Sequence, residues 1–376
     1  MHEWRELYIE PTSHCNLSCV MCARRSWTKE SAGHMDLALF DKTMDEIPPS
    51  VRRIFFGGVG EPLHHPAVIY MLRRAKETGR TVEMITNGTL LSPQMSREIV
   101  EAKLDMLWIS LDGTEEKSYE DIRQGASFKT LMDNIQTFNK RRFHPYGYAP
   151  RFDRISVKLG ISFVLMKHNL EQFKLLFQKA QALGIAQIKA THLIPYDESQ
   201  IANICYEQIL PGGAYDEPSL SSVRVDIPFL DLRHIREHDI LSLVENPVTA
   251  FSIMGTPLYI KENDCRFVRD GIAFLRWDGE LSPCMALLHE HTLYQQGAKR
   301  NIRPCSFGSA KKQPVIDTWE SDAYRAFRTR MLSGAFSHCT RCQPCEDFES
   351  NLEDCSGNPF PACGACLWAQ GLIQCP

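Results

Sequence analysis

Short apolar runs alternate with amphipathic stretches through the first half of the chain. The runs predicted as strands cover residues 7–9, 54–56, 82–85, 106–111, 155–165 and 185–194. Between them, apolar residues recur three or four positions apart, as from Phe128 to Phe138, which is the spacing of one helix face. Six predicted strands that alternate with about five predicted helices favour a parallel sheet joined by right-handed crossovers.

Cap residues predict where some of these helices begin. Ser92 and Pro93 supply the N-cap and the first turn of one helix, and Asn169 with Gln172 resembles a capping box before another. The alternation is too short for a complete eight-unit barrel of about 250 residues, and an open doubly wound sheet shows the same pattern. In both architectures ligands gather at the carboxyl ends of the strands.

Three cysteines, Cys15, Cys19 and Cys22, directly follow the first predicted strand with the spacing C-x3-C-x2-C. Three thiolates can bind three irons of a cubane iron–sulfur cluster, and the fourth iron then keeps an open coordination position. A zinc site would usually add a second cysteine or histidine pair. Disulfides would suit a secreted chain, but we expect no secretion, since residues 1–5 begin no apolar signal segment.

Glycine and polar residues stand at the ends of the predicted strands. They are Gly57, Gly58, Gly60, Glu61, Asn87, Ser110, Asp112 and, within the fifth strand, Ser162. Glycines allow a ligand to approach the backbone closely, and a carboxylate beside them could hold a cation. Asn-Gly and Asp-Gly are also common turn pairs, so each motif alone fits an ordinary turn equally well.

The order of these motifs resembles that of the radical S-adenosylmethionine (SAM) enzymes. The resemblance implies an α/β fold, a partial (β/α)6 TIM-type barrel. It implies that Cys15, Cys19 and Cys22 hold a [4Fe–4S] cluster whose open iron binds SAM. The glycine-rich loop ending at Glu61 would receive the SAM ammonium.

The remaining SAM contacts that the resemblance implies come from later strands. Ser110 and Asp112 would contact the ribose, and Asn87 belongs to the T-N-G motif of the same family. Ser162 is a weaker candidate for the SAM carboxylate, and a core or turn role fits it about as well. Met21 departs from the aromatic residue that many members carry there, although its thioether can still cover the adenine face.

Composition limits the class of protein. A chain of 376 residues is long enough for two or three domains, and its net charge of −4 gives no basic surface for nucleic acid. No apolar run approaches bilayer-spanning length, so we expect no membrane span. Fourteen cysteines without a signal segment indicate metal ligation in the reducing cytoplasm.

The cysteines are unevenly distributed, and this predicts a second module. After Cys22 only Cys205 occurs before Cys265, and we expect Cys205 to be a core residue. We therefore predict a barrel in residues 1–195, a connecting segment and possible substrate lid in 196–260, and a cysteine-rich module in 261–376. That module carries Cys265, Cys284, Cys305, Cys339, Cys342, Cys345, Cys355, Cys363, Cys366 and Cys375.

The first part of this module, C-x13-G-x4-C, resembles the SPASM domain, which holds up to two auxiliary [4Fe–4S] clusters. The resemblance implies one cluster on Cys265, Cys284 and Cys305 with a fourth ligand from the tail, and another anchored by Cys339, Cys342 and Cys345. The later spacing departs from the usual SPASM pattern, and zinc is an alternative because C-x2-C pairs suit tetrahedral sulfur sites. The pairs His64–His65 and His289–His291 are assigned no ligand role.

Strings at both ends of the chain are similar to one subfamily. Residues 8–12, 357–361 and 363–371 are similar to radical SAM maturases associated with tungsten-containing aldehyde:ferredoxin oxidoreductases. The resemblance implies reductive cleavage of SAM, a low-potential electron donor of ferredoxin or flavodoxin type, and a tungstopterin oxidoreductase or its cofactor as substrate. Peptide or protein modification is the alternative enzyme function, and a non-enzymatic iron–sulfur carrier is the alternative class.

Overall fold

The parallel sheet predicted from the alternation is present and is longer than expected. The structure, a computed structural model, describes residues 3–27, 32–143, 156–206, 223–227, 249–253, 265–337, 339 and 345–374. Eight parallel strands lie side by side in chain order: β1 (Glu6–Ile9), β2 (Arg53–Phe56), β3 (Thr81–Thr86), β4 (Met106–Ser110), β5 (Lys158–Leu165), β6 (Gln187–His192), β7 (Val223–Ile227) and β8 (Thr249–Ile253).

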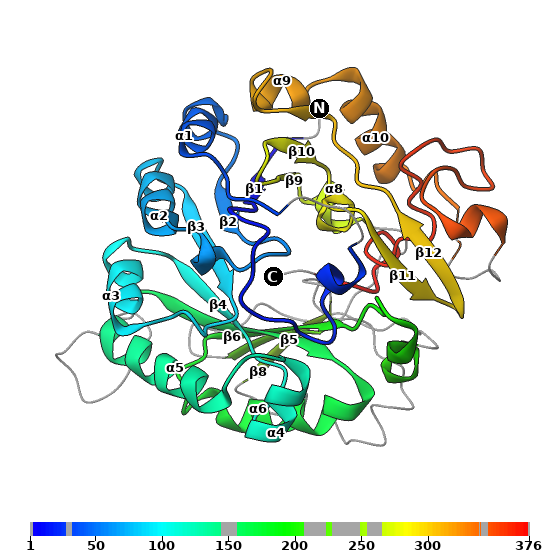
Figure 1. Ribbon diagram of the computed structural model, residues 1–376. Helices are drawn as coiled ribbons and strands as arrows, with labels where there is room; N and C mark the ends of the chain where they lie inside the picture. The colour runs from blue at the N-terminus through cyan, green and yellow to red at the C-terminus, as the bar shows by residue number, and fades with distance from the viewer. Residues whose placement is uncertain are drawn as a thin grey trace.

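Helices cover the outer side of this curved sheet (Figure 1). They are α1 (Leu37–Glu46), α2 (Val68–Glu77), α3 (Pro93–Glu101), α4 (Glu116–Ile122), α5 (Phe128–Arg142) and α6 (Leu170–Ala180). The predicted face of α5 is confirmed, because Leu131, Ile135 and Phe138 are buried. Ser92 caps α3 as predicted, since its side chain accepts a hydrogen bond from the Met95 N–H.

The C-terminal module continues the same sheet on the far side of β1. Its first strand, β9 (Ile272–Leu275), pairs in parallel with β1, and β10 (Glu280–Ser282) returns antiparallel after the predicted Asp278–Gly279 turn. Gly279 has a φ of +93°, a conformation that glycine adopts without steric cost. The remaining elements are β13 (Gly308–Ser309), the hairpin β11 (His291–Gln295) and β12 (Ala298–Ile302), and helices α8 (Arg266–Arg269), α9 (Val315–Trp319) and α10 (Asp322–Leu332).

The barrel stays open, because no described strand pairs β8 with the other end of the sheet at β13. The loop that follows β1 lies on the inner side of the curved sheet, near the C-terminal end of the chain (Figure 1). The loop that carries Cys15, Cys19 and Cys22 therefore lies inside the barrel mouth.

Two features differ from the sequence predictions. Residues 196–260 do not only connect modules, because β7 and β8 in this segment extend the parallel sheet. The Asn169 side chain does not cap α6; it donates to the carbonyls of Asp112 and Val164 at 3.0 and 2.9 Å. These carbonyls lie at the ends of buried strands, where an internal partner replaces water.

Candidate functional site

The cysteine loop after β1 is held between two other strand-end segments. The Glu61 N–H donates to the carbonyl of His14 at 2.8 Å, and the Val20 N–H donates to the carbonyl of Ile122 at 2.9 Å. Gly60 has to be glycine, because a Cβ there would lie 2.0 Å from the carbonyl oxygen of Thr12. The glycine-rich loop thus packs directly against the cysteine loop, as two parts of one site.

Polar groups surround the sulfurs of the cysteine loop. The Leu17 N–H donates to the Cys15 Sγ at 3.4 Å, and the Asn87 amide and the Arg123 guanidinium lie 3.9 Å from the Cys15 and Cys19 sulfurs. Burial raises the pKa of each of the three thiols, that of Cys22 to about 11. Iron binds thiolates, so ligation at this loop releases protons, and the surrounding donors stabilise the resulting negative charge.

Glu61 joins the glycine-rich loop to the T-N-G motif. Its buried carboxylate accepts hydrogen bonds from the Thr86 hydroxyl at 2.6 Å, the Asn87 N–H at 2.7 Å and the Leu63 N–H at 3.0 Å. Burial raises its pKa. Gly57 and Gly58 lie against the protein's own Phe55 and Glu10 side chains. The glycines therefore allow close packing within the protein, a role that the sequence analysis did not foresee.

The residues predicted to contact the ribose and the carboxylate of SAM divide into two groups. Ser110 and Ser162 are register partners on β4 and β5, and both line a cavity at the barrel mouth. Asp112 does not line that cavity. It is fully buried, forms an ion pair with Arg123 at 2.6 Å and accepts the Val164 N–H at 2.6 Å.

Arg123 is a residue that the sequence analysis did not select. It lines the cavity, and its guanidinium lies beside both Cys19 and Asp112. Burial alone lowers the pKa of Arg123, but the Asp112 carboxylate outweighs burial and raises it. Arg123 therefore remains a cation beside the cluster loop. Its position eleven residues after Asp112, past a short helix, was the available signal.

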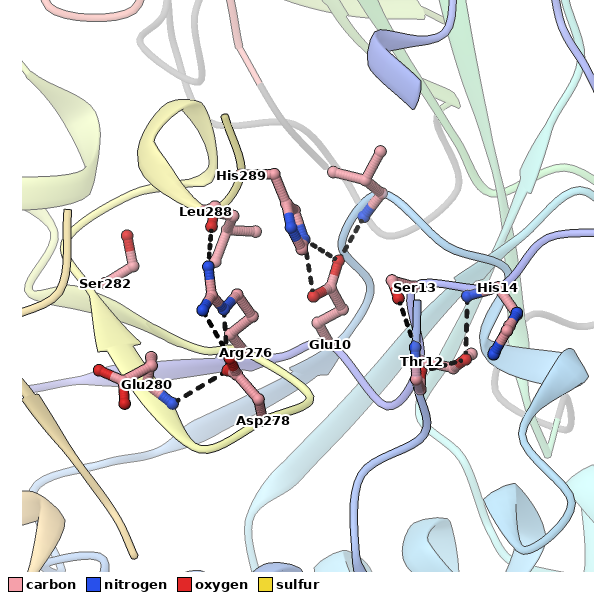
Figure 2. A network of polar contacts seen from close by, with 12 residues as sticks. Glu10, Thr12, Ser13, His14, Arg276, Asp278, Glu280, Ser282, Leu288 and His289 are labelled. Atoms are coloured by element: carbon pink, nitrogen blue, oxygen red, sulfur yellow. Dashed lines mark hydrogen bonds and ion pairs between the residues drawn. The ribbon is translucent and has the colours of Figure 1, made fainter. Parts of the chain in front are cut away.

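A second unforeseen pair, Glu10 and His289, joins the barrel to the C-terminal module (Figure 2). The His289 Nε2 lies 2.9 Å from both carboxylate oxygens of Glu10, and the Val59 N–H donates to the same carboxylate at 3.1 Å. Both side chains are buried, and the Trp27 ring packs on His289 with ring centroids 4.4 Å apart. Arg276 supports this region by donating to the Leu288 carbonyl at 2.8 Å.

The cavity lies between the two modules and has an empty volume of about 1270 Å³, part of it continuous with solvent. Cys19, Met21 and Cys22 contribute one wall, and strand-end residues contribute others. The C-terminal module closes it with Phe274, Met285, Ala286, His289, His291, Trp368, Ile373 and Gln374. A cavity at the carboxyl ends of parallel strands is the expected place for a ligand.

A smaller pocket of about 640 Å³ lies next to the cavity and shares Ala286, His291 and Trp368 with it. Four cysteines line this pocket: Cys265, Cys284, Cys363 and Cys366. Burial raises the pKa of each of the last three. The set differs from the one predicted, because two tail cysteines line the pocket and Cys305 does not.

The other cysteines of the module are more dispersed. Cys345 and Cys355 are exposed, Cys339 is half-buried beside Gly364, and Cys342 and Cys375 lie outside the described residues. Within the described part of the chain, no three His, Cys, Asp or Glu side chains converge as they would around one metal ion. Cys205 is buried, as predicted.

Comparisons with known proteins confirm the class that this site indicates. Residues 9–162 match the Radical SAM superfamily, and residues 265–346 match the SPASM iron–sulfur cluster-binding domain. The chain is a radical SAM enzyme with a C-terminal SPASM domain, and iron–sulfur clusters and SAM are its cofactors. Cys363 and Cys366 lie beyond the matched part of the second domain.

Among its relatives, the chain is 29% identical to the tungsten-containing aldehyde ferredoxin oxidoreductase cofactor-modifying protein of Pyrococcus furiosus, over 98% of this chain and 96% of that protein. Its fold is similar to that of SuiB from Streptococcus suis bound to its precursor peptide SuiA (TM-score 0.60, 17% identity, 88% of this chain and 67% of that one). It is also similar to anSMEcpe with bound AdoMet (TM-score 0.57, 16% identity, 92% and 87%).

The described helices include none that is both long and apolar enough to span a bilayer.

Proposed function

We propose that this protein cleaves SAM at the cysteine loop and uses the resulting radical to modify the cofactor of a tungsten oxidoreductase, or the oxidoreductase itself. One observation carries the proposal. A single cavity is lined by Cys19 and Cys22 on one side and shares three residues with the four-cysteine pocket on the other. A substrate in this cavity would lie between two iron–sulfur sites.

The cysteine loop suits a cluster with one open iron. Its three thiols come from one short loop and are surrounded by the donors Asn87, Arg123 and the Leu17 N–H. When bound there, a [4Fe–4S] cluster with SAM on its open iron supplies a 5′-deoxyadenosyl radical. The residues of this chain orient SAM and exclude water, and Arg123 holds a positive charge beside the reacting centre.

We assign the SAM contacts in two tiers. Ser110, Ser162 and Met21 line the cavity and would contact SAM directly. Glu61, Asn87 and Asp112 are already hydrogen-bonded within the protein, and they would act by holding the glycine-rich loop and Arg123 in place. The SAM dissociation constant of Ser110→Ala and Ser162→Ala variants tests this assignment: unchanged affinity in both would remove the two serines from the site.

We further infer that the auxiliary pocket holds a fully ligated cluster on Cys265, Cys284, Cys363 and Cys366. A cubane with four cysteine ligands has no open iron, so this cluster would carry electrons rather than bind substrate. Its wall adjoins the cavity, which suits transfer of an electron from or to the substrate. A low-potential protein of ferredoxin or flavodoxin type would be the reductant.

The tungsten assignment is supported by similarity to the Pyrococcus furiosus protein over nearly the full length of both chains. The experiment that tests it compares a tungsten-containing aldehyde oxidoreductase produced with and without this protein. Mass spectrometry of the isolated oxidoreductase and its cofactor should show a mass difference. Identical products would contradict the proposed function.

Peptide modification is the second candidate, because SuiB bound to a precursor peptide and anSMEcpe share the fold. Formation of a crosslink or oxidation of a residue in a co-produced small peptide would favour it. A carrier without enzymatic activity would form no 5′-deoxyadenosine from SAM after reduction.

A further inference from the structure

One wall of the cavity carries buried polar atoms that have no hydrogen-bond partner among the described residues. His192, at the end of β6, is 2% exposed and lines the cavity. Neither of its ring nitrogens has a hydrogen-bond partner in the described part of the chain. Its ring packs on Tyr206, with centroids 5.1 Å apart, so the imidazole is held in place by an aromatic contact.

Gln374 stands beside this histidine's strand and comes from the C-terminal tail. Its amide Nε2 donates to the Ala190 carbonyl at 2.5 Å, and its backbone N–H donates to the Thr191 hydroxyl at 3.2 Å. The side chain is therefore fixed, yet its carbonyl Oε1 is buried and has no partner among the described residues. The tail thus holds a hydrogen-bond acceptor at the cavity wall.

Burying a polar group without a hydrogen-bond partner destabilises the folded protein. The buried carboxylates of Glu10, Glu61 and Asp112, in contrast, all accept backbone hydrogen bonds. The difference indicates that His192 and Gln374 are kept for a ligand. Burial lowers the pKa of His192 to about 3, so the ring is neutral at physiological pH and offers one donor and one acceptor.

The rest of the lining limits the chemistry of that ligand. Six aromatic side chains line the cavity: Tyr8, Trp27, Phe55, Tyr196, Phe274 and Trp368. Among the described lining residues, Arg123 alone has a permanent charge, and Asp112 neutralises it. The Trp27 Nε1, buried and without a partner in the described chain, adds a donor. Flat rings pack well against such walls, whereas a phosphate or carboxylate would lack a counter-charge.

We propose that His192 and Gln374 form a hydrogen-bonding subsite for an uncharged, planar heteroaromatic group that carries N–H or O–H donors, of which a pterin ring is one example. The inference deepens the proposed function, on which the choice of a pterin rests, by naming the part of the substrate that the cavity recognises. The tail that supplies Gln374 also supplies Cys363 and Cys366, so the proposed subsite and the auxiliary pocket share one segment of the chain.

Neopterin is a suitable probe, because it is uncharged, planar and fluorescent. Its affinity would be measured by equilibrium dialysis with the full chain, its clusters reconstituted, in the presence of SAM. We expect wild-type protein to bind neopterin, and His192→Phe and Gln374→Met each to weaken binding about tenfold or more, which is about 1.4 kcal/mol. The SAM dissociation constant should stay within about twofold. His192→Phe should also leave the melting temperature unchanged or raise it, because an unpaired polar group is removed.

His65→Phe is the matched control. His65 is also buried, but its nitrogens are used by the Met35 carbonyl at 3.0 Å and the Ala67 N–H at 3.1 Å, outside the cavity. This variant should lower the melting temperature and leave neopterin affinity unchanged. The opposite pattern in the two histidine variants would show that His192 has only a structural role and would overturn the proposal.

Three other results would overturn it: no neopterin binding by the wild-type protein, equal binding by the variants, or a parallel loss of SAM affinity, which would assign the pair to SAM. Binding of a capped tetraglycine peptide with the same dependence on His192 would assign the subsite to a peptide backbone instead. If neopterin binds as expected but the tungsten oxidoreductase is unaltered, only the proposed function fails.

Discussion

The two cysteine sites differ in the number of cysteines and in the cavity that these cysteines line. The loop after β1 carries three thiols, of which Cys19 and Cys22 line the large cavity. The pocket of the C-terminal module brings together four cysteines, and apolar side chains such as Leu293 and Phe327 complete its lining. A cubane has four irons, so only the first site would leave an iron open to a ligand. This difference agrees with the proposal that SAM chemistry takes place at the loop and that the pocket carries electrons.

The surroundings of the two sites support the same division. The side chains of Asn87 and Arg123 direct hydrogen-bond donors at the Cys15 and Cys19 sulfurs, and Arg123 also lines the cavity. In the pocket, Arg300 is buried and donates to the Ala365 carbonyl at 3.2 Å, between the two tail cysteines. Arg300 therefore anchors the segment that carries the ligands. Donors near a cluster and burial around it both adjust its reduction potential.

The strongest test of the comparison removes a sulfur from the loop. We expect Cys19→Ala to abolish formation of 5′-deoxyadenosine, because the remaining two sulfurs cannot hold the SAM-binding cluster. Iron analysis should show about four fewer irons per chain, with the auxiliary cluster signal retained in electron paramagnetic resonance. SAM cleavage at the wild-type rate by this variant would contradict the assignment.

The pocket is tested by two cysteines that lie close together in the fold. Cys363→Ala should remove about four irons per chain, yet the reduced protein should still cleave SAM. Cys305→Ala is the matched control, since Cys305 is equally buried but does not line the pocket. It should retain full iron content. Loss of iron from Cys305→Ala, with none from Cys363→Ala, would restore the ligand set expected from the sequence.

The same contrast separates what the sequence could predict from what it could not. The cysteine loop lies within eight residues, so its spacing alone indicated the cluster, and the apolar runs of β1 to β6 were visible as patterns. The pocket draws cysteines from both ends of the C-terminal module, and no local spacing encodes which of them meet. The parallel pairing of β9 with β1 and the contact between Glu10 and His289 are long-range for the same reason.

Asp112 shows how a correct motif can suggest an incomplete role. The strand-end position indicated a ligand contact, but a carboxylate also pairs with any cation that the fold brings near, here Arg123. Because a buried charge without its partner is unstable, this pairing takes precedence over exposure to the cavity. Arg123 stands eleven residues after Asp112, past a short helix, and this spacing was the available sign that the chain brings it back to the strand end.

The Asp112→Asn variant tests this pairing role, and its effect should be smaller than those of the cysteine variants. It leaves Arg123 buried without a counter-charge, so we expect the free energy of unfolding to fall by about 3 kcal/mol in urea titrations. SAM affinity should then change less than stability. The surface control is Asp133→Asn, whose partner Lys129 is exposed, and it should cause no measurable change. A large loss of SAM affinity without loss of stability would mean that Asp112 contacts SAM directly.

The smallest expected effect concerns the contact that connects the two regions. The Glu10 carboxylate binds the Val59 N–H of the glycine-rich loop and the His289 ring of the SPASM module, so it couples the SAM side to the auxiliary side. A double-mutant cycle with Glu10→Gln and His289→Phe should give a coupling energy of about 1 kcal/mol in the free energy of unfolding, because the two groups touch and are buried. Additive effects would mean that the Glu10–His289 contact does not couple the two modules. If coupling is found, the same cycle should be measured on SAM affinity. A purely structural contact gives coupling in the free energy of unfolding only. A contact that transmits the state of the C-terminal module to the SAM site gives coupling in both measurements.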